Sequence, residues 1–290
     1  MKNYVIVTDS TSDLPEEIVE QLGIKVIPLT FELEGKSYLD HHDAGGLGVH
    51  EFYERLRKGE KSITSLINTG TFIDYLQPIL KAGDDILYIA FSSALSGTYN
   101  SSLLAIEELL EEYKDSKIIS IDSKSASVGE GLLVYSAAKK KEEGLSIEEL
   151  QEWILQNMLK VCHWFTVDDL NHLKRGGRVS ALSATVGTAL NVKPILHVDN
   201  EGHLIPISKV RGRKKSLYAL LEHMVETCVD PQEQVIFIGH GDSLEDAELL
   251  AQLIREKFNV KDIVISNIGS VIGTHSGPGT IALFFFGTKR

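Results

Sequence analysis

Short apolar runs alternate with amphipathic stretches along nearly the whole chain. Runs rich in β-branched and aromatic residues, such as 4–8, 85–91 and 235–239, have the length of buried strands, whereas 99–113 and 244–258 place apolar residues at helical spacing. Alternation of this kind is typical of βα units. The pattern therefore predicts an α/β protein with largely parallel sheets and helices on both faces.

The predicted elements form two groups that divide near residue 160. The first group has strands 4–8, 25–31, 85–91 and 117–122 and helices 13–23, 49–57, 71–80, 99–113, 128–141 and 147–159. The second has strands 161–167, 194–198, 205–210, 235–239, 263–268 and 280–286 and helices 217–225 and 244–258. Ser146, with Glu149 three residues on, predicts a capping box for helix 147–159. We expect two closely packed α/β domains, 1–160 and 161–290, with a cleft between them.

Composition narrows the class of partner. A formal net charge of -12 argues against a nucleic-acid binder and allows at most transient contact with an anionic membrane, because phosphate affinity needs a field of the opposite sign. No apolar run approaches the ~20 residues that span a bilayer, and segment 1–8 lacks the features of a secretory signal. A cytoplasmic location is therefore expected. Cys162 and Cys228 lack metal-ligand spacing, and we expect both to be reduced core residues.

Small polar residues gather at the carboxyl ends of predicted strands, where open α/β sheets place their ligands. Two such clusters, 9–13 and 92–98, lead from a strand into a helix. Free N–H groups at a helix start favour an anion, although simple capping also explains a hydroxyl there. We favour capping for 9–13, because its two aspartates would repel an anion, and a ligand contact for Ser93.

Two further clusters carry hydroxyls, and the first of them is predicted to lie on a loop. Thr64 and Ser65 lie between apolar residues, where either a turn or a ligand contact explains them. In the glycine-rich segment 269–279, His275 lies among hydroxyl side chains on a backbone that can approach a ligand closely. A lone histidine is usually structural, but this setting favours a functional role for His275.

Familiar catalytic and metal motifs do not fit their context. Segment 277–282 matches a dinucleotide fingerprint but leaves no room for a βαβ unit, and the serine of 273–277 is one place too late for a hydrolase elbow. One group combines histidines with aspartates: Asp40, His41, His42, Asp43 and His50. Adjacent histidines do not present a ligand face, so a solvated loop explains the group, and no metal or cofactor is expected.

Two basic segments, 174–178 and 209–215, stand out in this acidic chain. A charge run is usually a solvated face. Both segments contain glycines, however, and they would also serve as docking points for a phosphate-bearing partner.

Taken in order, these segments resemble the DegV family, whose bacterial members bind fatty acids and include the fatty-acid-binding subunit of a two-component fatty acid kinase. The match covers nearly the whole chain and is carried by 8–15, 92–99, 122–123 with Gly129 and Gly131, 167–170, 173–180, 193–196 and 271–279. The resemblance implies two α/β domains with an acyl chain buried between or within them.

The resemblance also implies the residues that contact the ligand. By position, the carboxylate contacts fall on Thr64, Ser65, Ser93 and His275. Where the family pattern continues with Gln-Pro, this chain has Leu66-Ile67, so the loop is expected to differ there. The glycine-rich segment 45–48 has no assigned place relative to the ligand.

The resemblance implies that the chain is a lipid-presenting subunit rather than an enzyme. The ligand would be a long-chain fatty acid, and a separate cytoplasmic ATP-dependent fatty acid kinase would form the acyl phosphate for phospholipid synthesis. That kinase would dock at Arg175, Arg178, Arg211 or Arg213. Burying about fourteen methylenes at ~0.8 kcal/mol each offers roughly 11 kcal/mol before the costs of association.

Two rival functions remain. One is a sensor for another small anion, such as a phosphorylated sugar. The other is a serine hydrolase that uses Ser93 or Ser276 with His275 and Asp9.

Overall fold

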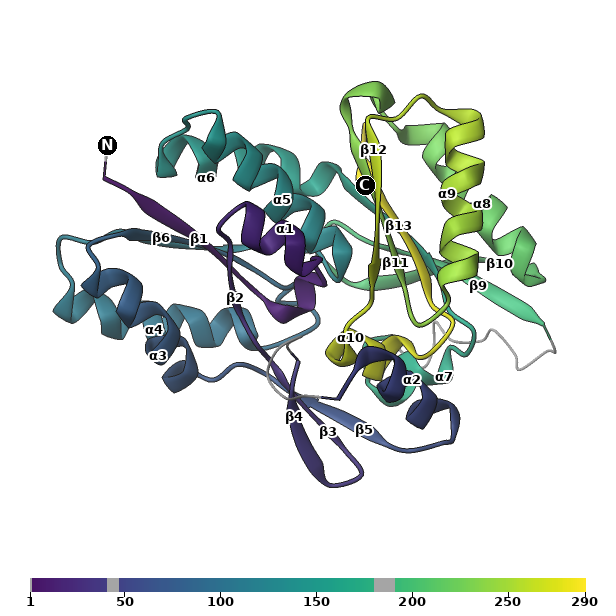
Figure 1. Cartoon of the computed structure of the whole chain (residues 1–290), viewed down its shortest axis with the longest axis horizontal. Helices are drawn as coiled ribbons and strands as arrows, with labels where there is room; N and C mark the ends of the chain where they lie inside the picture. The colour runs from purple at the N-terminus through teal and green to yellow at the C-terminus, as the bar shows by residue number, and fades with distance from the viewer. Residues whose placement is uncertain (1, 41–46, 180–190) are drawn as a thin grey trace.

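The computed structural model describes residues 2–40, 47–179 and 191–290, and Figure 1 shows the arrangement of its elements. A four-stranded sheet has the order β2-β1-β6-β7, and all its pairs are parallel. Its strands are β1 (Tyr4–Asp9), β2 (Lys25–Ile27), β6 (Asp85–Ala90) and β7 (Ile118–Asp122). Helices cover both faces, as the alternating pattern predicts. One face carries α3 (Thr69–Lys81) and α4 (Thr98–Glu112), and the other carries α1 (Glu16–Gln21), α5 (Val128–Glu142) and α6 (Ile147–Asn157).

The second sheet has six strands in the order β10-β9-β8-β13-β11-β12. They are β8 (Val161–Thr166), β9 (Val192–Val198), β10 (Leu204–Arg211), β11 (Val235–His240), β12 (Asp262–Asn267) and β13 (Ile281–Phe286). Only the pair β11–β12 is parallel. The α/β class is confirmed, but a largely parallel arrangement is wrong for this sheet, because β9 and β10 form a hairpin and β13 inserts antiparallel between β8 and β11. Helices α8 (Arg213–Thr227) and α9 (Leu244–Lys257) cover its outer face.

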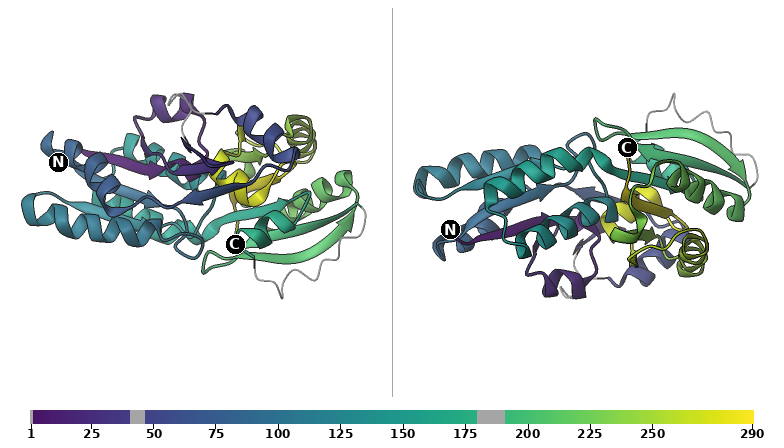
Figure 2. Two further views of the ribbon diagram at one scale, coloured as in Figure 1. Left: turned by 90° about the horizontal axis from the view of Figure 1, so that it is seen from below. Right: turned by 90° about the horizontal axis from the view of Figure 1, so that it is seen from above.

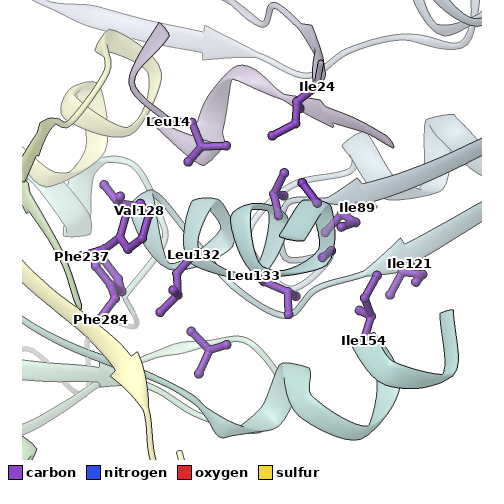
Figure 3. Close-up of a cluster of buried hydrophobic side chains, with 14 of the residues drawn as sticks. Leu14, Ile24, Ile89, Ile121, Val128, Leu132, Leu133, Ile154, Phe237 and Phe284 are labelled. Carbon is purple, nitrogen blue, oxygen red and sulfur yellow. The ribbon is translucent and has the colours of Figure 1, made fainter. Parts of the chain in front are cut away.

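Helix α5 lies between the two sheets and packs against both. Figure 3 shows Val128, Leu132 and Leu133 of α5 among Ile89 of the first sheet and Phe284 of the second. Gly129 makes the close approach possible, since a Cβ there would lie 2.3 Å from His163 Nε2. The strands of the first sheet end at residue 122 and those of the second begin at 161. Because one core spans both, the division into domains near 160 stays a prediction.

A small third sheet was not expected from the sequence. It is antiparallel, in the order β4-β3-β5, and consists of β3 (Thr30–Leu33), β4 (Lys36–Leu39) and β5 (Ser62–Ser65). The predicted strand 25–31 is therefore two strands, separated at Pro28, which has no N–H to donate. The short helix α10 (Ser270–Ser276) packs against β3 and β5 of this sheet and contacts the helices α2 (Val49–Arg57) and α7 (Asn171–Arg175).

Helix α10 occupies the glycine-rich segment, for which no helix was predicted. It lies near the centre of the molecule in both views of Figure 2 and contacts β5, α2 and α7. Gly277 and Gly279, with φ of 79° and 78°, then turn the chain into β13. The 3-10 turns Ser10–Ser12, Met158–Lys160 and Pro231–Glu233 complete the described elements, and the capping box of Ser146 with Glu149 on α6 is confirmed.

Candidate functional site

A cavity of about 220 Å³ lies beside α10, with walls from the six-stranded sheet, from β5 and from the loops that follow β5, β6 and β7. Most of its lining is aliphatic or aromatic, including Phe91, Leu95, Phe165, Val198 and Phe284. Four polar residues, Thr64, Ser65, His275 and Ser276, line it where β5 meets α10, and other polar lining residues come from separate segments, among them Thr11, Ser96, Ser127, His163 and Thr280. A long apolar chamber with a few convergent polar groups is the usual form of a site for an amphipathic ligand.

Strand β5 is fixed to α10 by two side-chain hydrogen bonds. Thr64 Oγ1 lies 2.8 Å from His275 Nε2, and Ser62 Oγ lies 2.7 Å from Thr274 Oγ1. Alternate residues of a strand face the same side, which explains why Ser62 and Thr64 both meet the helix. The predicted pair Thr64 and His275 is therefore brought together at the cavity.

The surroundings of His275 define its protonation. Burial, and then the nearby charge of Arg178, lowers the pKa of His275 to about 4, so the ring is neutral at pH 7. Nδ1 is buried, with no hydrogen-bond partner among the described residues. A proton on Nδ1 would leave a buried donor unsatisfied, at a cost of about 1–3 kcal/mol, so we assign the proton to Nε2. Nε2–H then donates to Thr64, whose own hydroxyl hydrogen is available to the cavity.

Arg178 lines the cavity instead of standing on an open docking surface as expected. Its Nε donates to Leu95 O at 3.1 Å, and its Nη1 donates to Gly176 O. Burial lowers its pKa, yet the guanidinium remains a cation at neutral pH. Among the lining residues that the structure describes, it alone carries a permanent charge. A positive charge beside His275 favours an anionic head group at this end.

Ser93 is not among the residues that line the cavity, and its role as a ligand contact stays a prediction. Its side chain is exposed, and its Oγ donates to Asp122 Oδ2 at 2.5 Å. Ser96 and Gly97 of the same loop line the cavity instead, directly before α4 begins. The signal for Ser96 was its place at the helix start, where the chain turns back toward the sheet.

Ser65 and Leu66 lie at the rim of the cavity. Ser65 is exposed, and 47% of Leu66 is accessible to solvent. Ile67, the second residue of the unexpected Leu-Ile pair, is buried in the core. The polar end is therefore reachable from the surface, and Leu66 stands beside the opening.

The other three predicted docking arginines have different surroundings. Arg175 is exposed, with Nη2 3.2 Å from His172 Nδ1, and Arg211 is exposed on β10. Arg213 is partly buried and forms ion pairs with Asp246 at 2.9 Å and with Asp168 at 3.5 Å. Those carboxylates already neutralise Arg213, which weakens its case as a docking residue.

The residues of the rival hydrolase do not assemble into a catalytic chain. Asp9 accepts hydrogen bonds from Thr11 and from Tyr88 at 2.8 Å, whereas His275 is bonded to Thr64. The buried Ser276 Oγ lines the cavity region without a partner among the described residues. Without a contact from base to serine or from acid to base, the geometry does not support nucleophilic catalysis.

A buried acid network below the cavity was not expected from the sequence. Thr8 Oγ1 lies 3.0 Å from Ile89 O and 2.9 Å from Glu130 Oε1, yet its single hydrogen can satisfy only one of them. A protonated Glu130 that donates to Thr8 satisfies both. Burial, followed by the charge of Asp9, raises the pKa of Glu130 well above 4.5, which agrees with this assignment. Thr11, which lines the cavity, links Asp9 to Glu130.

No group of three metal-binding side chains is assembled within residues 2–40, 47–179 and 191–290. The predicted solvated group falls partly outside the described residues, since it includes His41, His42 and Asp43, and the same holds for Gly45 and Gly46. His50 lies 2.8 Å from Asp242. In the described part of the chain, no helix has the length and apolar character needed to cross a bilayer.

Comparison with known proteins gives consistent matches over the whole chain. A family model described as an uncharacterised protein of the DegV family matches residues 3–288. A DegV domain-containing protein of Clostridium perfringens is 50% identical over 290 residues, which cover 100% of this chain and 99% of the relative.

Two solved structures show the same fold. A Thermotoga maritima protein described as revealing a fatty acid binding function is 31% identical, with a TM-score of 0.86 and coverage of 98% of this chain and 99% of that one. The fatty acid kinase (Fak) B3 protein of Streptococcus pneumoniae, solved with linoleic acid, has a TM-score of 0.84 at 24% identity, with the same coverage. At that identity the second likeness concerns the fold alone.

Proposed function

This chain belongs to the DegV family, and on that premise we propose that it binds one long-chain fatty acid, with the acyl chain in the cavity and the carboxyl group at the end formed by Thr64 and His275. The observation that carries the proposal is the combination of apolar walls with a hydroxyl, an imidazole and a guanidinium at one end. Related proteins that bind fatty acids support it.

The head-group contacts follow from the donors at that end. Thr64 can donate its hydroxyl hydrogen, because His275 Nε2–H occupies the acceptor side of its oxygen. Ser65 and Ser96 add hydroxyls, and Arg178 supplies the charge that a buried carboxylate needs. A carboxylate beside His275 would also raise the pKa of the ring.

We further propose that the bound carboxyl is presented to a cytoplasmic ATP-dependent kinase, which forms the acyl phosphate. The opening beside Ser65 and Leu66 supports access to the carboxyl. The exposed Arg175 and Arg211 support docking of a partner with an acidic surface, although the chain as a whole is acidic. In this scheme the chain itself carries no catalytic residue.

The test is extraction of the purified protein with organic solvent, followed by mass spectrometry of the bound lipid. The wild type is expected to hold about one long-chain fatty acid per chain, and Thr64→Val and His275→Ala should each retain less. Ser93→Ala is the matched control, because Ser93 is a neighbouring hydroxyl outside the cavity, and it should retain the wild-type amount. A wild type without lipid that also fails to bind added palmitate or oleate would refute the proposal and favour the small-anion sensor.

A further inference from the structure

Arg290 uses every N–H of its guanidinium in hydrogen bonds to the protein. Nε donates to Val161 O at 3.0 Å. Nη1 donates to Lys124 O at 2.6 Å and to Asp199 O at 3.1 Å, and Nη2 donates to Ser125 Oγ at 3.0 Å and to Met158 O at 2.8 Å. No Asp or Glu of the described residues forms an ion pair with it. Four carbonyl groups and one hydroxyl thus surround a planar fork with five donors.

The five acceptors belong to three segments that continue into the wall of the cavity. Lys124 and Ser125 lead directly into Ala126 and Ser127, which line it. Asp199 follows the lining residue Val198. Arg290 therefore ties the loop after β7 to the start of β8 and to the turn between β9 and β10.

A second set of contacts supports the same wall through His163, another lining residue. His163 Nδ1 lies 2.9 Å from Val161 O, the carbonyl that also accepts from Arg290, and Ala126 N donates to His163 Nε2 at 3.4 Å. Only the neutral ring with its proton on Nδ1 satisfies both partners. Burial lowers the pKa of His163 well below 6.5, which agrees with a neutral ring.

The loop after β7 needs such support because its backbone is strained. Lys124 and Ser127 have φ of 51° and 54°, in the left-handed region that side chains disfavour. Residues of this kind persist only where their surroundings fix them. The guanidinium contacts fall on Lys124 itself and on Ser125, and the His163 contact falls on Ala126, directly before Ser127.

We infer that Arg290 is a positioning residue for ligand binding, which holds segment 124–127 in the shape that closes the acyl-chain wall. The inference rests on the proposed function, because it assumes that the chamber holds an acyl chain. Burial lowers the pKa of Arg290 to about 10, and the group remains charged at neutral pH. A lysine keeps the charge but has three donors on one nitrogen, so at least two of the five acceptors lose their partner.

The variants are Arg290→Lys, Ser125→Ala and the control Phe285→Leu. Phe285 is fully buried in the same sheet but belongs to the core under α8 and α9, so its truncation lowers stability without touching the cavity lining. The rate of palmitate transfer from each protein to fatty-acid-free albumin gives the dissociation rate constant, and the melting temperature reports stability. Hydrogen exchange at amides 123–127 in the ligand-free protein reports the wall itself.

Arg290→Lys is expected to raise the dissociation rate constant about tenfold, equivalent to 1.4 kcal/mol, and to speed amide exchange at 123–127. Ser125→Ala should raise the dissociation rate constant and the amide exchange rate by less. The double variant should add little to the effect of Arg290→Lys, because the two substitutions remove the same contact. Phe285→Leu should lower the melting temperature and leave the rate unchanged.

A wild-type rate in Arg290→Lys would overturn the inference, and so would an equal rise in Phe285→Leu at equal loss of stability. If Arg290→Lys does not fold, Ser125→Ala decides by the same criteria. A wild type that holds no palmitate would instead refute the proposed function, and amide exchange would still decide whether Arg290 holds the wall.

Discussion

Gly176→Ala is expected to damage the head-group site while leaving the fold intact. A Cβ on Gly176 would lie 2.2 Å from His275 Nδ1, whereas ordinary contacts begin at 3.4 Å. The imidazole must therefore move by about 1.2 Å, the difference between these distances. Displacement of that size removes the 2.8 Å hydrogen bond from His275 to Thr64.

The loss of affinity follows from the hydrogen bonds that depend on this geometry. A hydrogen bond to a charged carboxylate contributes about 1.5–3 kcal/mol, so the dissociation constant for palmitate should rise about ten- to a hundredfold. Gly176 has a φ of -72°, which alanine adopts without strain, so the backbone itself does not oppose the change.

Gly177→Ala is the matched control one residue away. Gly177 has a φ of 70°, and a Cβ added there would meet no atom within 4 Å, so alanine costs about 1 kcal/mol of stability through backbone strain but does not reach His275. Displacement of a fluorescent fatty acid and thermal unfolding are measured for both variants. Wild-type affinity in Gly176→Ala, or equal loss of affinity in both, would refute the assignment of His275 to the head group.

Three further changes test the buried groups. Glu130→Gln should flatten the pH dependence of stability, measured by urea unfolding. Because the pKa of Glu130 is raised in the folded state, the folded wild type binds an extra proton and its unfolding free energy falls as pH rises above 4.5. The same slope in the variant would contradict a protonated Glu130. Because the pKa of His275 is lowered in the folded state, the unfolded chain binds a proton first, and the empty wild type should lose about 3 kcal/mol of stability as pH falls from 6.5 to 4. His275→Asn should remove this loss. Unchanged acid sensitivity in the variant would count against the lowered pKa of His275. Gly129→Ala, whose Cβ would lie 2.6 Å from Phe284, should destabilise the protein by about 1–3 kcal/mol, whereas Gly70→Ala, with its nearest contact at 3.4 Å, should be neutral by thermal unfolding.

The hydrophobic pattern of the sequence was sufficient to predict elements whose structure depends on neighbouring residues. Helix α2 spans Val49–Arg57 as expected, and β6 and β8 lie within a residue of their predicted bounds, because each has a clear period or a continuous apolar run. The strand order of the second sheet could not be predicted from the sequence. The run that forms β13 reads as a buried strand in any sheet, and nothing local records that it lies between β8 and β11.

The same distinction explains the site. The glycine-rich setting with nearby hydroxyls favours a functional His275, whereas Thr64 is predicted beside the ligand only by the resemblance to the family, because the residues alone allow a turn or a ligand contact. The sequence does not distinguish Ser93 from Ser96, because both stand in one serine-rich loop and only the turn into α4 decides which hydroxyl lines the cavity. Arg178 was assigned to the surface because charge alone does not reveal that α7 directs the following segment inward.

Ligand binding in the cavity should stabilise the fold, because parts of the cavity wall are held by contacts between distant parts of the chain. Thr64 of β5 meets His275 of α10 at the cavity, and Arg290 holds segment 124–127 against the second sheet. A ligand that fills the cavity should bind more tightly when both contacts are formed. Bound fatty acid should therefore stabilise the folded chain by about 2.7 kcal/mol at a free concentration one hundred times the dissociation constant. Arg290→Lys and Thr64→Val should each reduce that gain in melting temperature, and an equal gain in both variants and the wild type would show that the ligand binds elsewhere.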